Sequence, residues 1–295
     1  MREVHLYLGA HMSIAGGVHR ALERGLSIGC QAVQIFVKNQ LRWSAPPLAD
    51  EEIRAFRELA PRLASVFAHS AYLINLASPD PAVFTRSVAG LAEELHRCQV
   101  LGIELLVMHP GAHMGSGQEA GIRRLTEGVS QAYDRAEAPG VRLALETTAV
   151  RGTLLGGRFE ELRDMLDGLS GSGSLPAGIC LDTCHLFASG YELRSAQGYG
   201  RTMAALKQTV GLDCLKAAHL NDSEGGLGSG VDRHAHIGRG RIGTAGFRHL
   251  LGDRRLRELP GVLETPKSED LHEDVENLER LRRLARRVRS PGSGP

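Results

Sequence analysis

Eight short apolar segments, separated by longer stretches, constrain the fold of this chain more than any other feature of its sequence. Each segment has the length of a β-strand and is apolar almost without interruption, which is typical of strands covered on both faces. The segments are Leu6–Ala10, Ala32–Val37, Ser65–His69, Glu104–His109, Val141–Glu146, Gly178–Asp182, Leu215–Leu220 and Gly261–Glu264. Helical patterns lie between or after them, at Pro81–Leu101, Phe159–Leu169, Ala196–Val210, Ala245–Leu251 and Leu271–Val288, and another helix is expected to begin at Asp50. We therefore interpret the chain as eight successive strand–helix units.

This alternation predicts an α/β protein with a parallel sheet, because each helix returns the chain to the start of the next strand. Eight units favour a single-domain (β/α)8 TIM barrel over residues 1–289, since such barrels typically take about 250 residues. A doubly wound open sheet is the alternative, because the number of units does not show whether the sheet closes. The last segment, Ser290–Pro295, has the composition of a disordered tail.

The composition excludes several classes of protein. A hydrophobic content of 42% excludes a wholly disordered chain, and no apolar run reaches the roughly 20 residues of a membrane-spanning helix. An odd number of cysteines and a start without a signal-peptide pattern indicate a cytoplasmic protein without a disulfide framework. The net charge of +1 argues against a surface coated in positive charge, and we expect a monomer that does not bind membranes.

Six consecutive strand segments end in, or close to, a carboxylate or an imidazole. These residues are His69, His109, Glu146, Asp182, His219 and Glu264. In a parallel barrel the carboxyl ends of the strands meet on one face, which is the face that carries the active site. Burying so many carboxylates and imidazoles together is costly unless cations compensate their charge. The pattern therefore predicts a metal centre in preference to six separate structural residues.

Two local spacings add further candidate ligands. Asp232 and His234 are two residues apart, which places them on the same side of an extended segment and turns Arg233 away from it. Asp182 and His185 are three residues apart. Either the strand ends between them and turns, so that both point into one site, or the two residues bind different metals.

The nine candidate ligands offer nitrogen and oxygen atoms and no sulfur. They exceed one tetrahedral zinc site and suit a cluster of two or three zinc or manganese ions with open positions for water. Three dications carry more positive charge than the four carboxylates carry negative charge, so the centre would attract an anion such as a phosphate. Such ions make a nucleophile at neutral pH and stabilise both oxygens of an in-line displacement. The sequence thus indicates hydrolysis of a phosphate ester.

Longer motifs resemble one known family over about residues 8–279. They are Gly9-Ala10-His11-Met12-Ser13, Lys38-Asn39-Gln40 followed by Trp43, residues 69–76, His109-Pro110-Gly111, residues 181–185, residues 219–222, residues 231–234 and Leu263-Glu264-Thr265. In this order they resemble the endonuclease IV family of zinc-dependent, abasic-site DNA repair enzymes. The resemblance implies a (β/α)8 barrel with three zinc ions, manganese being an alternative at one site. By position it implies a first site of His69, His109 and Glu146, a second of Glu146, Asp182, His219 and Glu264, and a third of His185, Asp232 and His234.

The resemblance also implies a reaction and a substrate. The phosphodiester 5′ to an abasic site in duplex DNA is hydrolysed, which leaves a 3′-hydroxyl and a 5′-deoxyribose phosphate, and blocked 3′ ends are removed. Glu146 and Glu264 are the carboxylates expected to be essential for catalysis. Tyr72 and Leu73 resemble side chains that wedge into the duplex and hold the abasic nucleotide out of the stack. Flipping a nucleotide that has no base costs little stacking energy.

The sequence departs from the family pattern at two places that concern the site. The arginine that often follows the Asn-Gln pair is Leu41 here, and Arg42 comes next, so we expect one or the other to contact DNA. We also expect a DNA contact from Arg233. Thr147 stands where the family usually has asparagine, directly after Glu146, so the orientation of that glutamate is expected to change.

Two other functions account for parts of the pattern. A metal-dependent sugar isomerase or epimerase uses the same kind of barrel, but it usually needs one or two metal ions and no DNA wedge. A noncatalytic lesion-binding protein would bind abasic DNA without cutting it, but it leaves the ligand set unexplained. A zinc content of about three per chain would favour the nuclease.

Overall fold

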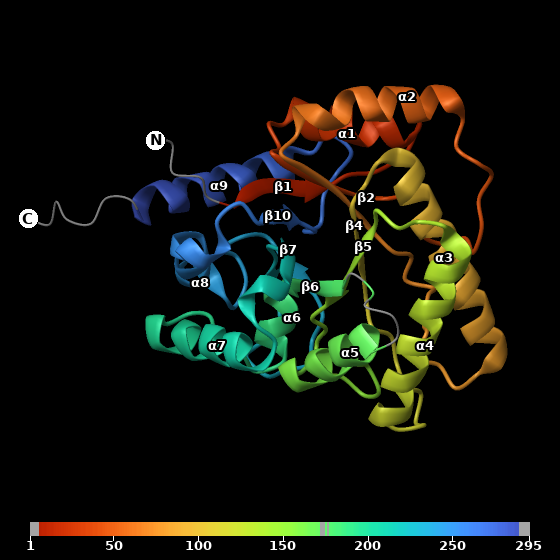
Figure 1. Cartoon of the computed structure of the whole chain (residues 1–295). Coiled ribbons are helices and arrows are strands. Elements are labelled where there is room, and N and C mark those ends of the chain that lie inside the picture. The colour runs from red at the N-terminus through yellow and green to blue at the C-terminus, as the bar shows by residue number, and fades with distance from the viewer. Residues whose placement is uncertain (1–5, 172–174, 176, 289–295) are drawn as a thin grey trace, which may run out of the picture.

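The eight predicted strands form a closed parallel barrel in the computed structural model, which describes residues 6–171, 175 and 177–288 (Figure 1). The strands are β1 (Tyr7–His11), β2 (Ala32–Phe36), β3 (Ser65–His69), β4 (Leu105–Met108), β5 (Arg142–Glu146), β6 (Ala177–Asp182), β7 (Leu215–His219) and β10 (Pro260–Leu263). β1 pairs with β2 on one side and with β10 on the other. This closure confirms the TIM barrel and excludes the open sheet. The tail expected at 290–295 lies outside the described residues.

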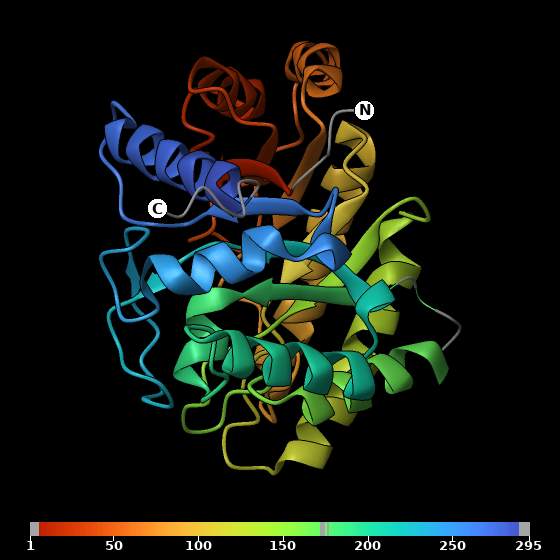
Figure 2. The ribbon, with the colours of Figure 1, turned by 90° about the vertical axis from the view of Figure 1, so that its left-hand side faces the viewer.

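Helices surround the barrel, as Figure 1 shows from one end, and Figure 2 shows α9 lying beside β1. They are α1 (Val18–Ser27), α2 (Asp50–Leu59), α3 (Pro81–Leu101), α4 (Gln118–Ala136), α5 (Phe159–Gly171), α6 (Thr183–Ala188), α7 (Ala196–Thr209), α8 (Gly243–Gly252) and α9 (His272–Val288). Short 3-10 helices occupy Ala60–Arg62, Leu212–Cys214 and Arg254–Leu256. Within the described ranges, no helix is both long and apolar enough to cross a membrane.

The bounds of α3 show how local sequence sets an element. The Asp80 side chain accepts hydrogen bonds from the backbone N–H groups of Ala82 and Val83, and Pro81 fits the first helical position, where no N–H is needed. The helix ends at Leu101, and the next residue, Gly102, has a φ of 78°, a left-handed conformation that glycine adopts without strain. These signals lie at the ends of the helix that the sequence predicted.

The barrel interior is filled by one small apolar cluster. Its members are Ala32, Phe67, Leu105, Val107, Ala144, Cys180, Ala217 and Val262, all buried. A larger apolar layer separates the strands from the surrounding helices. Because side chains alternate along a strand, the next inward position lies two residues further along each strand, near its carboxyl end.

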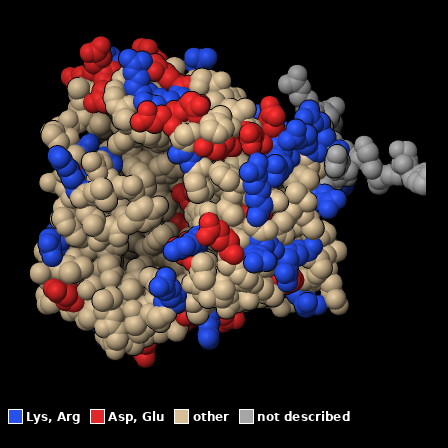
Figure 3. All heavy atoms as spheres, turned by 180° about the vertical axis from the view of Figure 1, so that it is seen from behind, with Lys and Arg blue, Asp and Glu red and all other residues tan. Residues whose placement is uncertain are grey.

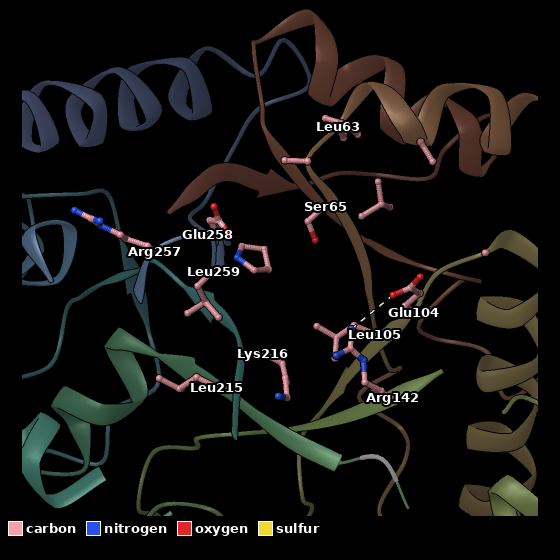
Figure 4. Close-up of a pocket in the computed structure, with 15 residues that line it drawn as sticks. Leu63, Ser65, Glu104, Leu105, Arg142, Leu215, Lys216, Arg257, Glu258 and Leu259 are labelled. Carbon is pink, nitrogen blue, oxygen red and sulfur yellow. Dashed lines mark ion pairs between the residues drawn. The ribbon is translucent and has the colours of Figure 1, made fainter. Parts of the chain in front are cut away.

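A cavity of about 480 Å³ lies at the opposite, amino-terminal end of the strands (Figure 4). Its lining includes Ser65, Leu105, Arg142, Leu215 and Pro260, which are the first residues of five barrel strands. Glu104 and Arg142 form an ion pair of 3.7 Å across it. This cavity is therefore separated from the predicted ligands by the length of the barrel.

Candidate metal centre

Six of the predicted ligands occupy the inward position directly above the apolar cluster of the barrel. Each follows a member of that cluster by two residues: His69 follows Phe67, His109 follows Val107, Glu146 follows Ala144, Asp182 follows Cys180, His219 follows Ala217 and Glu264 follows Val262. The period of two along a strand thus turns all six side chains toward the barrel axis. Strands that are far apart in the sequence thereby place their polar ends together.

The nine predicted ligands fall into three groups that could each hold a cation. The first group is His69, His109 and Glu146; the second is Glu146, Asp182, His219 and Glu264; the third is His185, Asp232 and His234. Within each group the ligand atoms lie within 4.8 Å of one another. The grouping is the one that the family resemblance implies, and Glu146 belongs to the first two groups.

Two more groups of acidic, cysteine or histidine residues occur in the described part of the chain. One is Asp182, Cys184 and His234, and the other is the exposed set Asp270, His272 and Glu273 at the start of α9. Burial raises the pKa of Cys184 to about 12, which disfavours the thiolate that a metal ligand must supply. In the exposed set, His272 Nδ1 lies 2.8 Å from Asp270 Oδ1 and its Nε2 lies 3.5 Å from Glu273 Oε1, so these residues already pair with one another.

The turn after β6 explains how Asp182 and His185 both reach the centre. β6 ends at Asp182 and α6 begins at the next residue, so the strand does end and turn between them. Asp182 caps this helix, since its Oδ1 accepts a hydrogen bond of 2.7 Å from the backbone N–H of His185. The two side chains belong to different groups, the second and the third.

Hydrogen bonds fix which nitrogen of each imidazole faces the centre. The Nδ1–H of three histidines donates to a backbone carbonyl: His69 to Ser70 (2.7 Å), His185 to Thr147 (2.8 Å) and His234 to Glu264 (3.1 Å). In His219 the Nε2–H donates to Gln34 Oε1 at 2.7 Å instead. The other nitrogen of each ring, Nε2 in the first three and Nδ1 in His219, faces a carboxylate, and His185 Nδ1 also lies 3.1 Å from Glu146 Oε1. A metal-binding histidine is usually held in this way.

These inward nitrogens lie against carboxylate oxygens at contact distances that require a positive charge. His69 Nε2 is 2.9 Å from Glu146 Oε2, and His219 Nδ1 is 3.0 Å from Glu146 Oε1. A neutral nitrogen and a carboxylate both present lone pairs, so a proton or a metal ion has to lie between them. The buried Nε2 of His234 has no hydrogen-bond partner, and Nε2 of His185 lies 2.9 Å from Asp232 Oδ1. Ring nitrogens that face a carboxylate or lack a partner are what a metal site provides, and the donor set therefore fits cations.

The electrostatics of the cluster also favour cations. Burial opposes the charged form of His185, but Asp182, Asp232 and Glu146 outweigh it and raise its pKa well above the usual value. Burial likewise opposes ionisation of Glu146, yet His219 and His109 hold its pKa well below the usual value. A cluster that draws protons onto its imidazoles stabilises positive charge, and a metal ion supplies that charge at neutral pH.

Two residues orient Asp182 and Glu264. Asn221 donates from Nδ2 to Asp182 Oδ2 at 2.7 Å, and its Oδ1 accepts the backbone N–H of Glu264 at 2.8 Å. Thr147, which replaces the usual asparagine, accepts the backbone N–H of Asp182 on Oγ1 at 2.8 Å. Asn221 belongs to the motif of residues 219–222, and no role was predicted for it. The replacement of asparagine by Thr147 was expected to affect Glu146, but the Thr147 hydroxyl contacts the neighbouring ligand Asp182 instead.

A small hairpin, β8 (Asp222–Ser223) with β9 (His234–Ala235), carries part of the third group. Asp222 is fully buried, and its carboxylate accepts backbone N–H groups of Gly238 (2.8 Å) and Ile242 (2.9 Å). The carboxylate thereby fixes the loop that follows His234. The hairpin gives no signal in the sequence, because its paired segments are only two residues long.

Gln34 and His11 also reach the ligands. Gln34 is a fully buried polar residue in the apolar segment that became β2, and its Nε2 donates to Glu264 Oε1 at 2.6 Å and to His11 Nδ1 at 2.8 Å. Burial lowers the pKa of His11 to about 3, so this ring is neutral and its Nδ1 can accept. A glutamine at an inward position of an apolar strand was a signal that could have identified this contact from the sequence.

The residues expected to contact DNA lie outside the three groups. The Tyr72 side chain is 57% exposed, and its ring centroid lies 5.6 Å from those of both His69 and His109. Leu41 is 75% exposed in the loop after β2, Arg42 is exposed beside it, and Leu73 is half-buried. The structure thus brings Tyr72 to the metal centre. Arg233 points away from the ligands on either side of it, as the spacing predicts. Its side chain is 75% exposed and lies 4.0 Å from Glu224.

One face of the molecule is hollowed. Figure 3 shows Asp and Glu side chains inside the hollow and Lys and Arg side chains on the surface beside it. A cavity of about 570 Å³ also adjoins the ligands, because its lining includes His11, which contacts Glu264, together with Asn39, Gln40 and Lys267. Acidic groups inside the hollow can hold cations, and basic groups beside it can attract an anionic polymer.

Comparison with known proteins agrees with this geometry. A family model described as a xylose isomerase-like TIM barrel matches residues 22–288. A probable endonuclease 4 from Chloroflexus aurantiacus is 48% identical over 278 residues, which cover 94% of this chain and 97% of that protein.

Solved structures agree as well. The crystal structure of endonuclease IV from Thermus thermophilus matches with a TM-score of 0.84 and 37% identity, covering 95% of this chain and 99% of that one. A D-tagatose 3-epimerase-like protein matches with a TM-score of 0.71 but only 18% identity, covering 95% of this chain and 98% of that one, and so shares the fold alone. The chain therefore belongs to the endonuclease IV family, which its motifs resemble, and is a nuclease of the hydrolase class.

Proposed function

We propose that this protein is an abasic-site DNA repair endonuclease that uses three zinc ions. In this proposal it hydrolyses the phosphodiester 5′ to an abasic site in duplex DNA, leaves a 3′-hydroxyl and a 5′-deoxyribose phosphate, and removes blocked 3′ ends. The observation that carries the proposal is the set of three ligand groups, two of which share the buried Glu146. Membership of a metal-dependent nuclease family supports it.

The three groups would each hold one ion. His69, His109 and Glu146 would bind the first, Glu146, Asp182, His219 and Glu264 the second, and His185, Asp232 and His234 the third. Manganese is an alternative to zinc at one of them. Zinc bound there would lower the pKa of a water molecule and offset the negative charge of the phosphate oxygens. Glu146 and Glu264 would be essential, because each lies among imidazoles and offers oxygens to the shared second group.

The exposed side chains around the centre would recognise the DNA. Tyr72 and Leu73 would enter the duplex beside the lesion, since the Tyr72 ring already contacts two first-group histidines. Leu41 and Arg42 would contact the duplex from the loop after β2, and the exposed Arg233 would contact phosphates from the hairpin beside the third group. Recognition would then rest on the ease with which an abasic nucleotide leaves the stack.

A cleavage assay with counted metal tests this proposal. The protein is loaded with zinc, its zinc content is measured by mass spectrometry, and a duplex with one tetrahydrofuran abasic analogue is followed on denaturing gels. We expect about three zinc per chain and one cut 5′ to the analogue. Glu264→Gln should fold but lose at least about 100-fold in rate, whereas the matched surface variant Glu273→Gln should cut normally. Intact DNA with folded, zinc-replete protein would refute the proposal.

The same experiment separates the two alternative functions. A sugar epimerase on this barrel would hold one or two metal ions per chain and leave the duplex intact. A lesion-binding protein would retain the abasic duplex tightly without a cut. Near-normal turnover by Glu264→Gln would contradict the ligand role of that residue alone.

We also propose that residues 1–289 form a single catalytic domain that acts as a monomer in the cytoplasm. The closed barrel and the family match over residues 22–288 support the single domain. Light scattering on the eluate of a sizing column checks the oligomeric state, and a mass of two chains would contradict the monomer.

A further inference from the structure

The buried side chain of Gln34 connects three polar residues at the second ligand group. Its Oε1 lies 2.7 Å from His219 Nε2, and its Nε2 lies 2.6 Å from Glu264 Oε1 and 2.8 Å from His11 Nδ1. It reaches these residues from β2, although β1 stands between β2 and β10 in the barrel order. No solvent competes for these contacts, because Gln34 and His219 are fully buried.

Only one orientation of the Gln34 amide is compatible with its neighbours. A carboxylate accepts hydrogen bonds and cannot donate them, so the amide NH2 group must face Glu264. The amide oxygen then faces His219, whose Nε2 must carry the proton that is donated. The lone pair of His219 is therefore on Nδ1, the atom that lies 3.0 Å from Glu146 Oε1 and 3.2 Å from Glu264 Oε2.

We infer that Gln34 is a positioning residue for the second metal site, because it sets the tautomer of His219 and holds the carboxylate of Glu264. This inference rests on the proposed function only in taking Glu146, Asp182, His219 and Glu264 as a metal site. Gln34 itself offers no atom to the metal, since both ends of its amide are already occupied. Partners of this kind affect metal affinity by about 10- to 100-fold when they are removed.

Two substitutions separate the contact of Gln34 to His219 from its contact to Glu264. Gln34→Met keeps the length of the side chain and removes all three hydrogen bonds, so His219 loses the acceptor that fixes its tautomer. Gln34→Glu keeps an acceptor for His219 but places a second carboxylate against Glu264. Gln131→Met is the matched control, because that glutamine lies on α4, far along the chain, and its one side-chain hydrogen bond among the described residues is to Glu127 of its own helix, at 3.3 Å.

The test is zinc retention against a chelator series, with zinc per chain counted by mass spectrometry. Gln34→Met should release one zinc per chain at a chelator concentration at least about 10-fold below that needed by wild type, while the other ions stay. Gln131→Met should match wild type. Nitrogen-15 spectra of the zinc-loaded proteins should show one histidine bound through Nδ1 in wild type and Gln34→Glu, and a mixture of tautomers in Gln34→Met.

Each other outcome overturns the inference. Equal retention curves for wild type and Gln34→Met would show that the contacts do not matter for the metal. Parallel loss of every ion from Gln34→Met would show a general packing role instead. Cleavage of the abasic duplex by wild type is measured alongside. Wild type that cuts and holds its zinc sustains the proposed function even where the role of Gln34 fails, and wild type that holds no zinc overturns both.

Discussion

Replacing Glu94 by glutamine should cost about 3–5 kcal/mol of unfolding free energy, because it leaves the ammonium of Lys38 buried without a counter-charge. Lys38 Nζ lies 2.8 Å from Glu94 Oε1, and both side chains are at most 2% exposed. The pair also connects two loops. Lys38 donates to the carbonyl of Arg42 at 2.8 Å, and the Glu94 carboxylate accepts the backbone N–H of Ala71 at 3.1 Å.

The magnitude follows from the burial of both charges. An exposed ion pair is worth little, because water solvates each partner when the other is removed. Neither partner of this pair can be solvated in that way. Glutamine keeps one oxygen that can accept a hydrogen bond, so the loss is mainly the uncompensated charge. Removing both charges together, in Lys38→Met/Glu94→Leu, should therefore cost less than either single change.

Urea unfolding followed by circular dichroism, on metal-free protein in chelator, measures these effects. Glu23→Gln is the matched control, because Glu23 pairs with Arg20 at 2.7 Å on the surface, and its unfolding free energy should not change measurably. The reasoning is refuted if Glu94→Gln costs less than about 1 kcal/mol, or if the double variant costs the sum of the two single variants.

The pH dependence of Lys38→Met has a definite sign. Burial raises the pKa of Glu94 above its usual value, and Lys38 opposes that rise. Without Lys38, the pKa of Glu94 in the folded protein lies even further above its pKa in the unfolded chain, so the folded variant binds a proton on Glu94 at a higher pH than wild type does. The stability deficit of Lys38→Met against wild type should therefore be larger at about pH 8 than at about pH 5.5. An equal deficit at both pH values would contradict a buried ionised carboxylate.

Three further predictions concern the metal centre and the DNA. Tyr72→Ala should weaken binding of the abasic duplex by about 10-fold or more with little change in the single-turnover rate, and Tyr72→Phe should restore it; unchanged affinity in a titration would contradict a wedge. Asp222→Asn removes one of the two oxygens that accept N–H groups of the loop after His234, so it should lower zinc per chain by about one. Full zinc content would contradict the role of Asp222. Removing zinc with a chelator should lower the melting temperature by several degrees, because buried carboxylates lose their counter-charge, and an unchanged melting curve would contradict bound cations.

The barrel strands could be predicted because all eight leave an apolar run in the sequence. Six of them also end in or beside a polar residue, which indicates the end of the strand that faces the metal centre. His69, Glu146 and Asp182 are each the last residue of their strand, as the sequence analysis expected. His109 and Glu264 each lie one residue beyond the end of their strand, because the backbone hydrogen bonds of the sheet end before the alternation of inward-facing side chains does.

The contacts that orient the ligands could not be predicted in the same way. Gln34 is marked as an inward-facing polar residue of an apolar strand, but the local pattern does not identify its partners. Those partners depend on distances across the barrel: Gln34 reaches His219, 185 residues away along the chain. The local sequence pattern predicts on which face of the sheet a side chain lies. Which residues it meets on that face is determined by how the sheet closes into a barrel.

The placement of charge also explains why a net charge of +1 was a poor guide to the partner. Glu146 and Asp182 are fully buried, and the side chain of Glu264 is 13% exposed, so these negative charges act on the cations they would hold rather than on an approaching ligand. Three dications would exceed the four carboxylates of the centre in charge. The recess would then attract a phosphate, and the basic side chains beside it would attract the rest of the backbone. A nearly neutral chain can therefore present a positive site to DNA, provided that its acidic residues are buried around metal.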